Sequence, residues 1–207
     1  MNNPLWLEWA QRLQAIAQTG LWYCQDPFDK ERYTAIREVA AEIMARGAAA
    51  NDHAPVVDLF CHDVGYATPK VDVRAAVFDG DRLLLVRERD DGGWTLPGGW
   101  ADVGSPPAAN ALREVREESG YEAEVVKLAA VCDRNNHDHP PIPFHAYKLF
   151  FLCRLKGGRA VQSIETDAVN FFGENEIPQL SLGRVNAAQI RHMFEHLRNP
   201  ELPTSYD

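Results

Sequence analysis

The sequence predicts an α/β protein, built as an α/β/α sandwich and preceded by a small N-terminal helical hairpin. Three observations predict this class. Apolar residues repeat at helical spacing between residues 4 and 46. From Val71 onward the apolar pattern changes to that of β-strands. The strand-like segments are interrupted by one central helix and followed by one terminal helix, an order typical of a sheet covered by helices.

The first 46 residues are expected to form two helices that pack as a hairpin. Asp26 or Asp29 can cap the second helix, and Pro27 suits its first turn. Residues 47–69 show no clear pattern. We therefore divide the chain into an N-terminal helical domain with its linker at residues 1–66 and a second domain at residues 67–207.

The second domain is expected to begin with a hairpin whose tight turn is Asp79-Gly80-Asp81. Gly157-Gly158 indicates another turn, before the last strand. Helices are expected at about 106–119 and 183–198. The strand segments are expected at 71–78, 82–86, 94–96, 124–132, 144–155 and 168–172.

Composition narrows the class of function. The chain has 207 residues and is 45% apolar, which allows a sizeable core. A net charge of −9 argues against nucleic acid as a partner, because such binding depends on clustered Lys and Arg. The four cysteines are far apart, so reduced thiols are expected. No apolar run approaches the roughly 18 residues of a membrane span, and no basic leader precedes Glu8. These features predict a cytoplasmic protein with no membrane partner.

Three carboxylates are expected on one helix face. Glu114, Glu117 and Glu118 have the spacing i, i+3, i+4, at which like charges destabilise a helix by a few tenths of a kcal/mol per pair. A hard cation such as Mg²⁺ or Mn²⁺ would offset this repulsion and would also bind phosphate. Gly98-Gly99 lets the backbone approach that metal or phosphate, and Gly120 predicts a left-handed helix end. The alternative is an ordinary solvated helix face.

The same segment resembles the Nudix box, G-x5-E-x7-R-E-U-x-E-E-x-G-U, in which U is a bulky apolar residue. Ser105 stands where the family has its first Glu, which contacts the box Arg. The resemblance therefore implies that another carboxylate orients Arg113. Ser105, followed by Pro106, also predicts a helix N-cap. Eight of the nine specified positions agree: Gly99, Arg113, Glu114, Val115, Glu117, Glu118, Gly120 and Tyr121.

The resemblance implies a Nudix α/β/α sandwich with a mixed sheet and a metal-dependent hydrolysis. By this resemblance, Glu117 and Glu118 are the main metal ligands, and Glu114 ligates or orients. The Gly99 carbonyl completes the metal shell, and Arg113 is structural. Glu165 lies about where many Nudix enzymes carry a catalytic loop carboxylate, with a plain loop Glu as the alternative.

Arg87 and Arg89 end a strand beside the expected catalytic loop, and a guanidinium matches phosphate oxygens. We expect one of them to bind phosphate. The alternative is a surface salt bridge to a neighbouring carboxylate, from Glu88, Asp90 or Asp91. Trp94 and Trp100 flank the Pro-Gly-Gly turn, where either stacking on a base or core packing is open.

The loop at residues 132–141 carries clustered polar groups between two expected strands. His137 and His139 could ligate zinc, but no third ligand stands at structural-zinc spacing. A loop that faces the substrate is the favoured interpretation, because functional residues concentrate on loops between rigid strands.

The resemblance covers the whole chain. Residues 6–10, 26–29, 68–74 and 96–104 match the bacterial Nudix subgroup whose two-helix N-terminal domain precedes the Nudix domain. Members act on a nucleoside diphosphate linked to a second group X, which implies a nucleoside monophosphate and a phosphorylated X as products. CDP-choline is the first expected substrate and ADP-ribose the second. The alternative is a catalytically weak or inactive Nudix module that senses nucleotides or binds RNA, which Ser105 supports.

The N-terminal hairpin holds more aromatic side chains than so small a unit needs for its own core. They predict either a homodimer interface or packing against the second domain, and the sequence leaves both open. These aromatic residues are Trp6, Trp9, Trp22, Tyr23 and Phe28.

Overall fold

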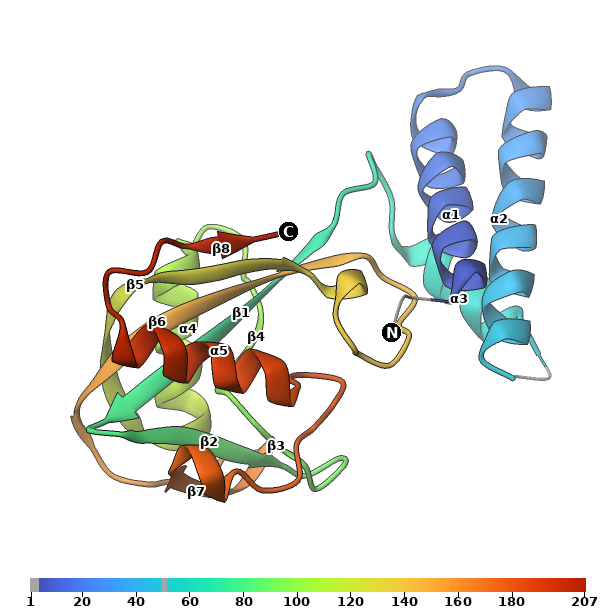
Figure 1. The fold of residues 1–207 in the computed structure, drawn as a ribbon. Coiled ribbons are helices and arrows are strands. Elements are labelled where there is room, and N and C mark those ends of the chain that lie inside the picture. Colours follow the sequence, from blue (N-terminus) through green and yellow to red (C-terminus); the bar gives the residue numbers. More distant parts are fainter. Residues whose placement is uncertain (1–3, 50–51) are drawn as a thin grey trace. The chain divides into compact units, whose positions relative to one another are not determined.

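The computed structural model describes residues 4–49 and 52–207. The chain forms two compact units (Figure 1). The first contains the chain up to Lys70 together with Pro141–His145, and the second contains Val71–Pro140 and Ala146–Asp207. A short loop between two strands of the second unit therefore belongs to the first.

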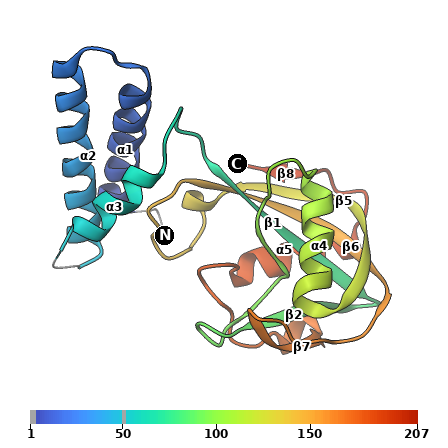
Figure 2. The ribbon, with the colours of Figure 1, turned by 180° about the vertical axis from the view of Figure 1, so that it is seen from behind.

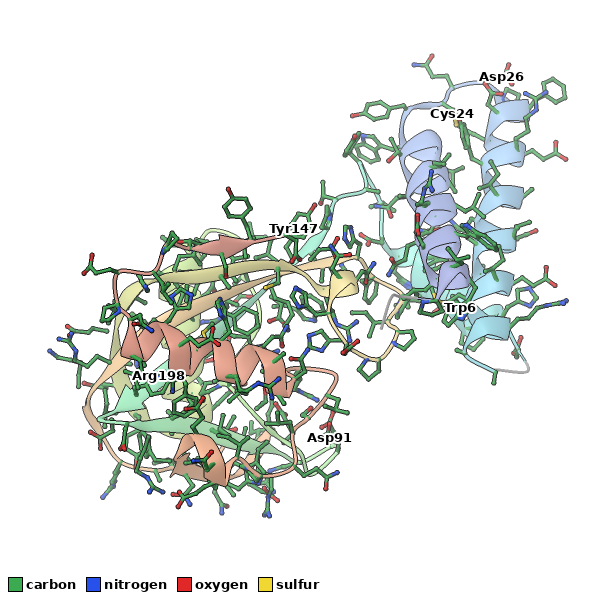
Figure 3. All side chains as sticks on the ribbon, in the orientation of Figure 1. Trp6, Cys24, Asp26, Asp91, Tyr147 and Arg198 are labelled. Atoms are coloured by element: carbon green, nitrogen blue, oxygen red, sulfur yellow. The ribbon has the colours of Figure 1, made fainter. Side chains whose placement is uncertain are left out.

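The first unit consists of the predicted hairpin and one further helix. Helices α1 (Leu5–Tyr23) and α2 (Pro27–Gly47) lie side by side, and α3 (Ala54–His62) follows them. Asp26 is the N-cap of α2, since its carboxylate accepts hydrogen bonds from the backbone N–H groups of Phe28 and Asp29 (Figure 3). The expected cap and the expected hairpin are confirmed.

Two glycines let α1 and α2 approach closely. A Cβ on Gly20 would lie 2.4 Å from the ring of Tyr33, and a Cβ on Gly47 would lie 2.1 Å from the ring of Trp6. Figure 3 labels Trp6 near the start of α1. Each aromatic ring thus fills the space that a side chain would need. The buried core of this unit consists of Leu7, Ala10, Ala40, Ala41, Met44 and Phe60.

The second unit is built on one mixed sheet in the order β3-β2-β1-β6-β5-β8, with β4 also paired to β1 and β7 to β2. Strand β8 runs parallel to β5, whereas the pairs β1–β2, β1–β4, β2–β3, β2–β7 and β5–β6 are antiparallel. The strands are β1 (Lys70–Asp79), β2 (Arg82–Glu88), β3 (Trp94–Thr95), β4 (Gly98–Trp100), β5 (Tyr121–Asp133), β6 (Ala146–Gly158), β7 (Thr166–Phe172) and β8 (Ser205–Tyr206).

Two helices cover opposite faces of this sheet, α4 (Pro107–Ser119) and α5 (Ala187–Arg198) (Figures 1 and 2). On one face Val115 of α4 packs in a core with Val77 of β1. On the other face Phe194 of α5 contacts a strand residue edge to face, with ring centroids 5.1 Å apart. Two short 3-10 turns, η1 (Arg134–Asn136) and η2 (Glu174–Glu176), complete the unit. The predicted α/β/α sandwich is confirmed.

Three local predictions were wrong or incomplete. Gly157-Gly158 is not a turn, because β6 continues through both residues and pairs with the start of β5. Helix α5 begins at Ala187 instead of residue 183, since Asn186 caps it by accepting the N–H of Gln189 at 2.9 Å. Helix α3 lies in the stretch for which the sequence showed no pattern.

All four cysteines are free thiols, as expected. Burial raises the pKa of Cys132 to about 11 and that of Cys153 to about 12, which suits packing residues. Cys24 lies where the chain leaves α1 (Figure 3). Over residues 4–49 and 52–207, none of the helices combines the length and the apolar character needed to cross a membrane.

The two neighbouring glycines at the end of β6 provide a matched test of this packing. Gly158 has a φ of +91°, and a Cβ there would lie 2.6 Å from the carbonyl oxygen of Gly120, whereas a Cβ on Gly157 would meet nothing within 4 Å. Gly158→Ala should lower the free energy of unfolding by roughly 1–3 kcal/mol. Gly157→Ala should change it by less than about 0.5 kcal/mol. Urea unfolding measures both, and equal effects would contradict this account.

Candidate active site

Strand β4 brings the glycine pair against the centre of the sheet. Gly98 is paired with Arg74 and Gly99 with Val73 of β1. Gly98 has a φ of +143°, and a Cβ there would lie 2.0 Å from the carbonyl oxygen of Val73. The lack of a side chain at Gly98 therefore lets the backbone of β4 lie close to the backbone of β1. Gly99 has more room, because the nearest atom to its added Cβ is a carboxylate oxygen of Glu114 at 3.9 Å.

The acidic helix α4 begins one residue later than Ser105 predicts. The N-cap position is Pro106, and no side chain caps the helix. Because Pro107 follows, Pro106 is restricted to the extended conformation it shows, with ψ at 147°. The prediction of a Ser105 cap is therefore wrong. At the other end Gly120 has a φ of +74°, so the predicted left-handed helix end is confirmed.

Glu118 is the most deeply placed acid of the helix. Its residue is 6% exposed, and its carboxylate accepts a hydrogen bond of 3.0 Å from the N–H of Gly98. Burial raises the pKa of Glu118 to about 8, although Arg74 and this hydrogen bond oppose the shift. Thr166 of β7 donates its hydroxyl to the Glu118 carbonyl at 2.7 Å. The last turn of α4 is thereby fixed to two strands.

Glu114 and Glu117 lie on the same side of the helix but nearer to solvent. The side chain of Glu114 is 15% exposed and that of Glu117 is 58% exposed. Burial raises the pKa of Glu114, Arg113 opposes that shift, and the charges of Glu117 and Glu165 add to it. The charge of Glu165 therefore acts on Glu114 although the two residues lie on different elements. The charges of Glu114 and Glu118 also act on each other, since Glu114 raises the pKa of Glu118.

Arg113 is held by carboxylates, as the resemblance implies. Its Nη1 lies 2.7 Å from Oδ2 of Asp102, and its Nη2 lies 2.8 Å from Oε1 of Glu114. Nη2 also donates to the side-chain oxygen of Asn110 at 3.2 Å. Asp102 lies three positions before the unusual Ser105, in the loop that leads into α4.

A buried ion network behind the site was not found from the sequence. Arg74 is 4% exposed, forms two hydrogen bonds of 2.8 and 2.9 Å to the carboxylate of Asp72, and donates to the Leu96 carbonyl at 3.2 Å. Lys148 of β6 lies 3.0 Å from the same carboxylate. Burial lowers the pKa of Lys148 to about 8, an effect that Asp72 opposes. One signal in the sequence could have revealed it. Asp72 and Arg74 are two positions apart in an otherwise largely apolar strand, so both side chains lie on the same face of the sheet.

Arg184 is a second residue that the sequence did not reveal. It lies 2.9 Å from Glu88 and 3.0 Å from Asp90, and it is 3.7 Å from Asp91, which Figure 3 labels. The sequence suggested these three carboxylates as salt-bridge partners of Arg87 or Arg89. In the structure their partner is Arg184 instead. Burial raises the pKa of Glu88, and the charge of Arg184 opposes this. Nothing in the local sequence links residue 184 with this loop.

Arg87 and Arg89 both bind the segment that carries Glu165. The Nε of Arg87 lies 2.7 Å from Asp167, and the guanidinium of Arg89 donates twice to the Ser163 carbonyl, at 3.3 and 3.2 Å. The backbone N–H of Arg89 donates to the Glu165 carbonyl at 3.0 Å. The two arginines therefore hold the Glu165 loop against β2. Phosphate binding by either arginine stays a prediction.

The loop after β5 is tied to the protein through its histidines. His139 is buried, with Nδ1 2.7 Å from the Leu182 carbonyl and Nε2 3.0 Å from the amide nitrogen of Gln189. Burial lowers the pKa of His139 to about 4, so the ring is neutral and both nitrogens are occupied. His137 contacts Asp207 at 3.1 Å. His139 therefore has a packing role.

The two tryptophans beside the glycine pair differ. Trp94 packs edge to face on Phe172, with ring centroids 4.8 Å apart, and borders the core. Trp100 is 48% exposed. The core-packing interpretation holds for Trp94, whereas Trp100 retains an accessible ring.

A mixed sheet between two helices, with a glycine strand that leads into an acidic helix, defines the Nudix class of fold. Comparison with known families agrees. Residues 68–194 match the NUDIX domain, and residues 4–60 match the model described as "UDP-X-like, N-terminal oligomerisation domain". The chain belongs to the NUDIX family and is a Nudix hydrolase.

Two relatives match nearly the whole chain, and a third matches about two thirds of it. A Bacillus subtilis (strain 168) protein named "Putative ADP-ribose pyrophosphatase YjhB" is 44% identical over 202 residues, which are 98% of this chain and 97% of that protein. A structure of a UDP-X diphosphatase has a TM-score of 0.63 and 32% identity and covers 100% of both chains. An ADP-ribose pyrophosphatase from Streptococcus suis 89-1591 has a TM-score of 0.62 and 40% identity, over 68% of this chain and 100% of that one.

The raised pKa of Glu118 predicts a pH-dependent stability in metal-free protein. Glu118 keeps its proton in the folded state up to a pKa of about 8, whereas the ordinary pKa of a glutamate is 4.5, so the free energy of unfolding should fall as the pH rises between them. Glu118→Gln should flatten this fall and be more stable than wild type at about pH 8. Thermal unfolding with a chelator present, between about pH 5 and 8, measures both. Parallel curves would contradict the assignment.

Proposed function

We propose that this Nudix hydrolase cleaves the diphosphate bond of a nucleoside diphosphate linked to a second group X. The products are a nucleoside monophosphate and a phosphorylated X. The observation that carries the proposal is the acidic helix α4 beside the glycine strand, where Glu118 accepts a hydrogen bond from Gly98 and the charges of Glu117 and Glu165 act on Glu114. The names of full-length relatives, which refer to ADP-ribose and to UDP-X, support this substrate class.

The donor set suits Mg²⁺ or Mn²⁺. Glu114, Glu117, Glu118 and the Gly99 carbonyl offer oxygen atoms, which hard divalent cations prefer, and their mutual repulsion favours a cation. In the described residues, no three His, Cys, Asp or Glu side chains converge as metal ligands. Glu118 faces the N–H of Gly98 and Glu114 faces Arg113, so a cation would compete with these contacts. When bound, it would neutralise diphosphate charge and acidify the attacking water.

Each side chain has a role in this reaction. Glu165, an exposed residue whose charge acts on Glu114, is the proposed general base that accepts the proton of the attacking water. Arg89 holds the Glu165 loop through its backbone N–H and its guanidinium. Arg87, 42% exposed beside Asp167, is the arginine better placed to reach phosphate. Arg113 keeps a structural role.

A substrate panel tests the proposal. CDP-choline, ADP-ribose and a UDP-sugar should be incubated with Mg²⁺ or Mn²⁺, and phosphate release measured after phosphatase coupling. CDP-choline is the first expectation from the sequence, and the names of the relatives support ADP-ribose and UDP-linked compounds. Turnover of at least one compound is expected. Nucleotide binding without any turnover would contradict the proposal and favour a sensing module.

Two variants test the site in the same panel. Glu118→Gln should lower kcat/KM by about 100-fold, because a ligand charge is lost. Glu165→Gln should lower kcat by about 10²–10⁴-fold and leave Mn²⁺ affinity nearly unchanged. The matched control is Glu122→Gln on β5, an exposed acid outside the site, which should behave as wild type. Wild-type rates for Glu118→Gln would refute the assignment.

We further propose that the helical unit forms a homodimer. The family model for residues 4–60 describes an oligomerisation domain. An apolar stripe with a spacing of four and seven residues runs along α1, where Leu5 is 62%, Trp9 51% and Ile16 54% exposed. On α2, Phe28 is 65% and Val39 48% exposed. Such apolar surface is typical of an interface.

Replacement at the centre of this stripe should separate the protomers. Trp9→Glu places a charge on the proposed interface and should raise the dissociation constant of the dimer at least tenfold. Val126→Glu, an exposed apolar position on β5, is the matched control and should leave the dimer intact. Light scattering after gel filtration measures the mass. A dimer that survives Trp9→Glu would place the interface elsewhere.

A further inference from the structure

The loop before α4 folds into a tight turn that brings residues 102 and 105 together. The N–H of Ser105 approaches the carbonyl oxygen of Asp102 at 3.4 Å, and Gly104 has a φ of +83°. This is the pattern of a β-turn, in which the first and fourth residues lie within about 7 Å of each other. A side chain at position 102 can therefore reach the space near position 105.

Asn110 fixes this turn on the helix. Asn110 is fully buried, its side-chain oxygen accepts the N–H of Asp102 at 3.2 Å, and its amide nitrogen donates to the carbonyl oxygens of Asp102 and Ser105 at 3.4 and 3.1 Å. The backbone of the turn is thus held at both ends by one side chain of α4. The carboxylate of Asp102 is left to bind Arg113, at 2.7 Å.

We infer that Asp102 is the positioning residue that replaces the missing box glutamate at Ser105. Arg113 bridges Asp102 and Glu114, so one guanidinium lies between two carboxylates. Without Asp102, Arg113 would be shared by the two remaining acids nearest to it, Glu114 and Glu117, which lies 4.0 Å away. Asp102 therefore holds Nη1 of Arg113 and leaves Glu117, 4.0 Å from that nitrogen, available to the cation, while Nη2 of Arg113 stays on Glu114. This inference rests on the proposed metal-dependent reaction.

The test is a transfer of the carboxylate between the two positions. Mn²⁺ affinity is measured by calorimetry and kcat and KM by the phosphate assay, in full-length protein. Asp102→Asn should weaken Mn²⁺ binding and lower kcat by about 10-fold each, with KM changed less than twofold. Adding Ser105→Glu to Asp102→Asn should restore both to within about threefold of wild type. Ser105→Glu alone should stay within about twofold, because Arg113 already has its partner.

A charge control separates position from charge. Val103 lies between the two positions and is fully exposed, so its side chain points away from the turn's contacts. Asp102→Asn with Val103→Asp restores the loop charge without the contact to Arg113 and should remain as impaired as Asp102→Asn. Equal rescue by this variant and by Ser105→Glu, or wild-type Mn²⁺ affinity in Asp102→Asn, would overturn the inference.

The outcomes also distinguish this inference from the proposed function. If no compound is turned over but Mn²⁺ affinity follows the expected pattern, the reaction is refuted and the role of Asp102 is supported. If wild type hydrolyses a substrate and Asp102→Asn binds Mn²⁺ equally well, the role of Asp102 is refuted and the reaction stands.

Discussion

The hydrogen bond from the N–H of Gly98 to the buried carboxylate of Glu118 joins the three parts on which the site depends. Gly98 belongs to a strand that only a residue without a side chain could bring so close to Val73. Glu118 belongs to the last turn of α4, which Thr166 ties to β7. Because this acid is buried, its charged form is costly, and the neighbouring guanidinium of Arg74 reduces that cost. These contacts couple the positions of the glycine strand, the acidic helix and the ion network.

The sequence predicted the parts of the fold in which local pattern and tertiary packing agree. Helical spacing of apolar residues predicted α1, α2 and α4, and all three helices are present. The predicted cap at Asp26 is present as well. It failed where tertiary contact decides. Gly157 and Gly158 signal a turn locally, yet the long ladder with β5 extends them as strand. Helix α3 has nine residues, with Phe60 as its fully buried contact, so its pattern is too short to detect.

The candidate site divides in a similar way. The glutamates of α4 and Arg113 follow from spacing on one helix, and the structure places them on one side. Arg74 and Arg184 act across strands and loops, Arg184 from more than ninety positions beyond the loop it binds. Such contacts depend on how distant segments pair, which local sequence patterns do not reveal. The partner of Arg113 could be expected as a carboxylate, but its identity required the turn at Asp102.

The short segment Pro141–His145 lies between β5 and β6 in the sequence but belongs to the helical unit. The side chain of Gln11 donates to the Ile142 carbonyl at 3.0 Å, and the Lys70 ammonium lies 4.7 Å from the centre of the Phe144 ring. The chain therefore enters the helical unit twice. If the chain were cut at the linker, the C-terminal fragment would keep residues 141–145 but lose the helices that they contact. The two modules are thus not separable by a single cut, and any exchange of N-terminal domains between relatives has to include this loop.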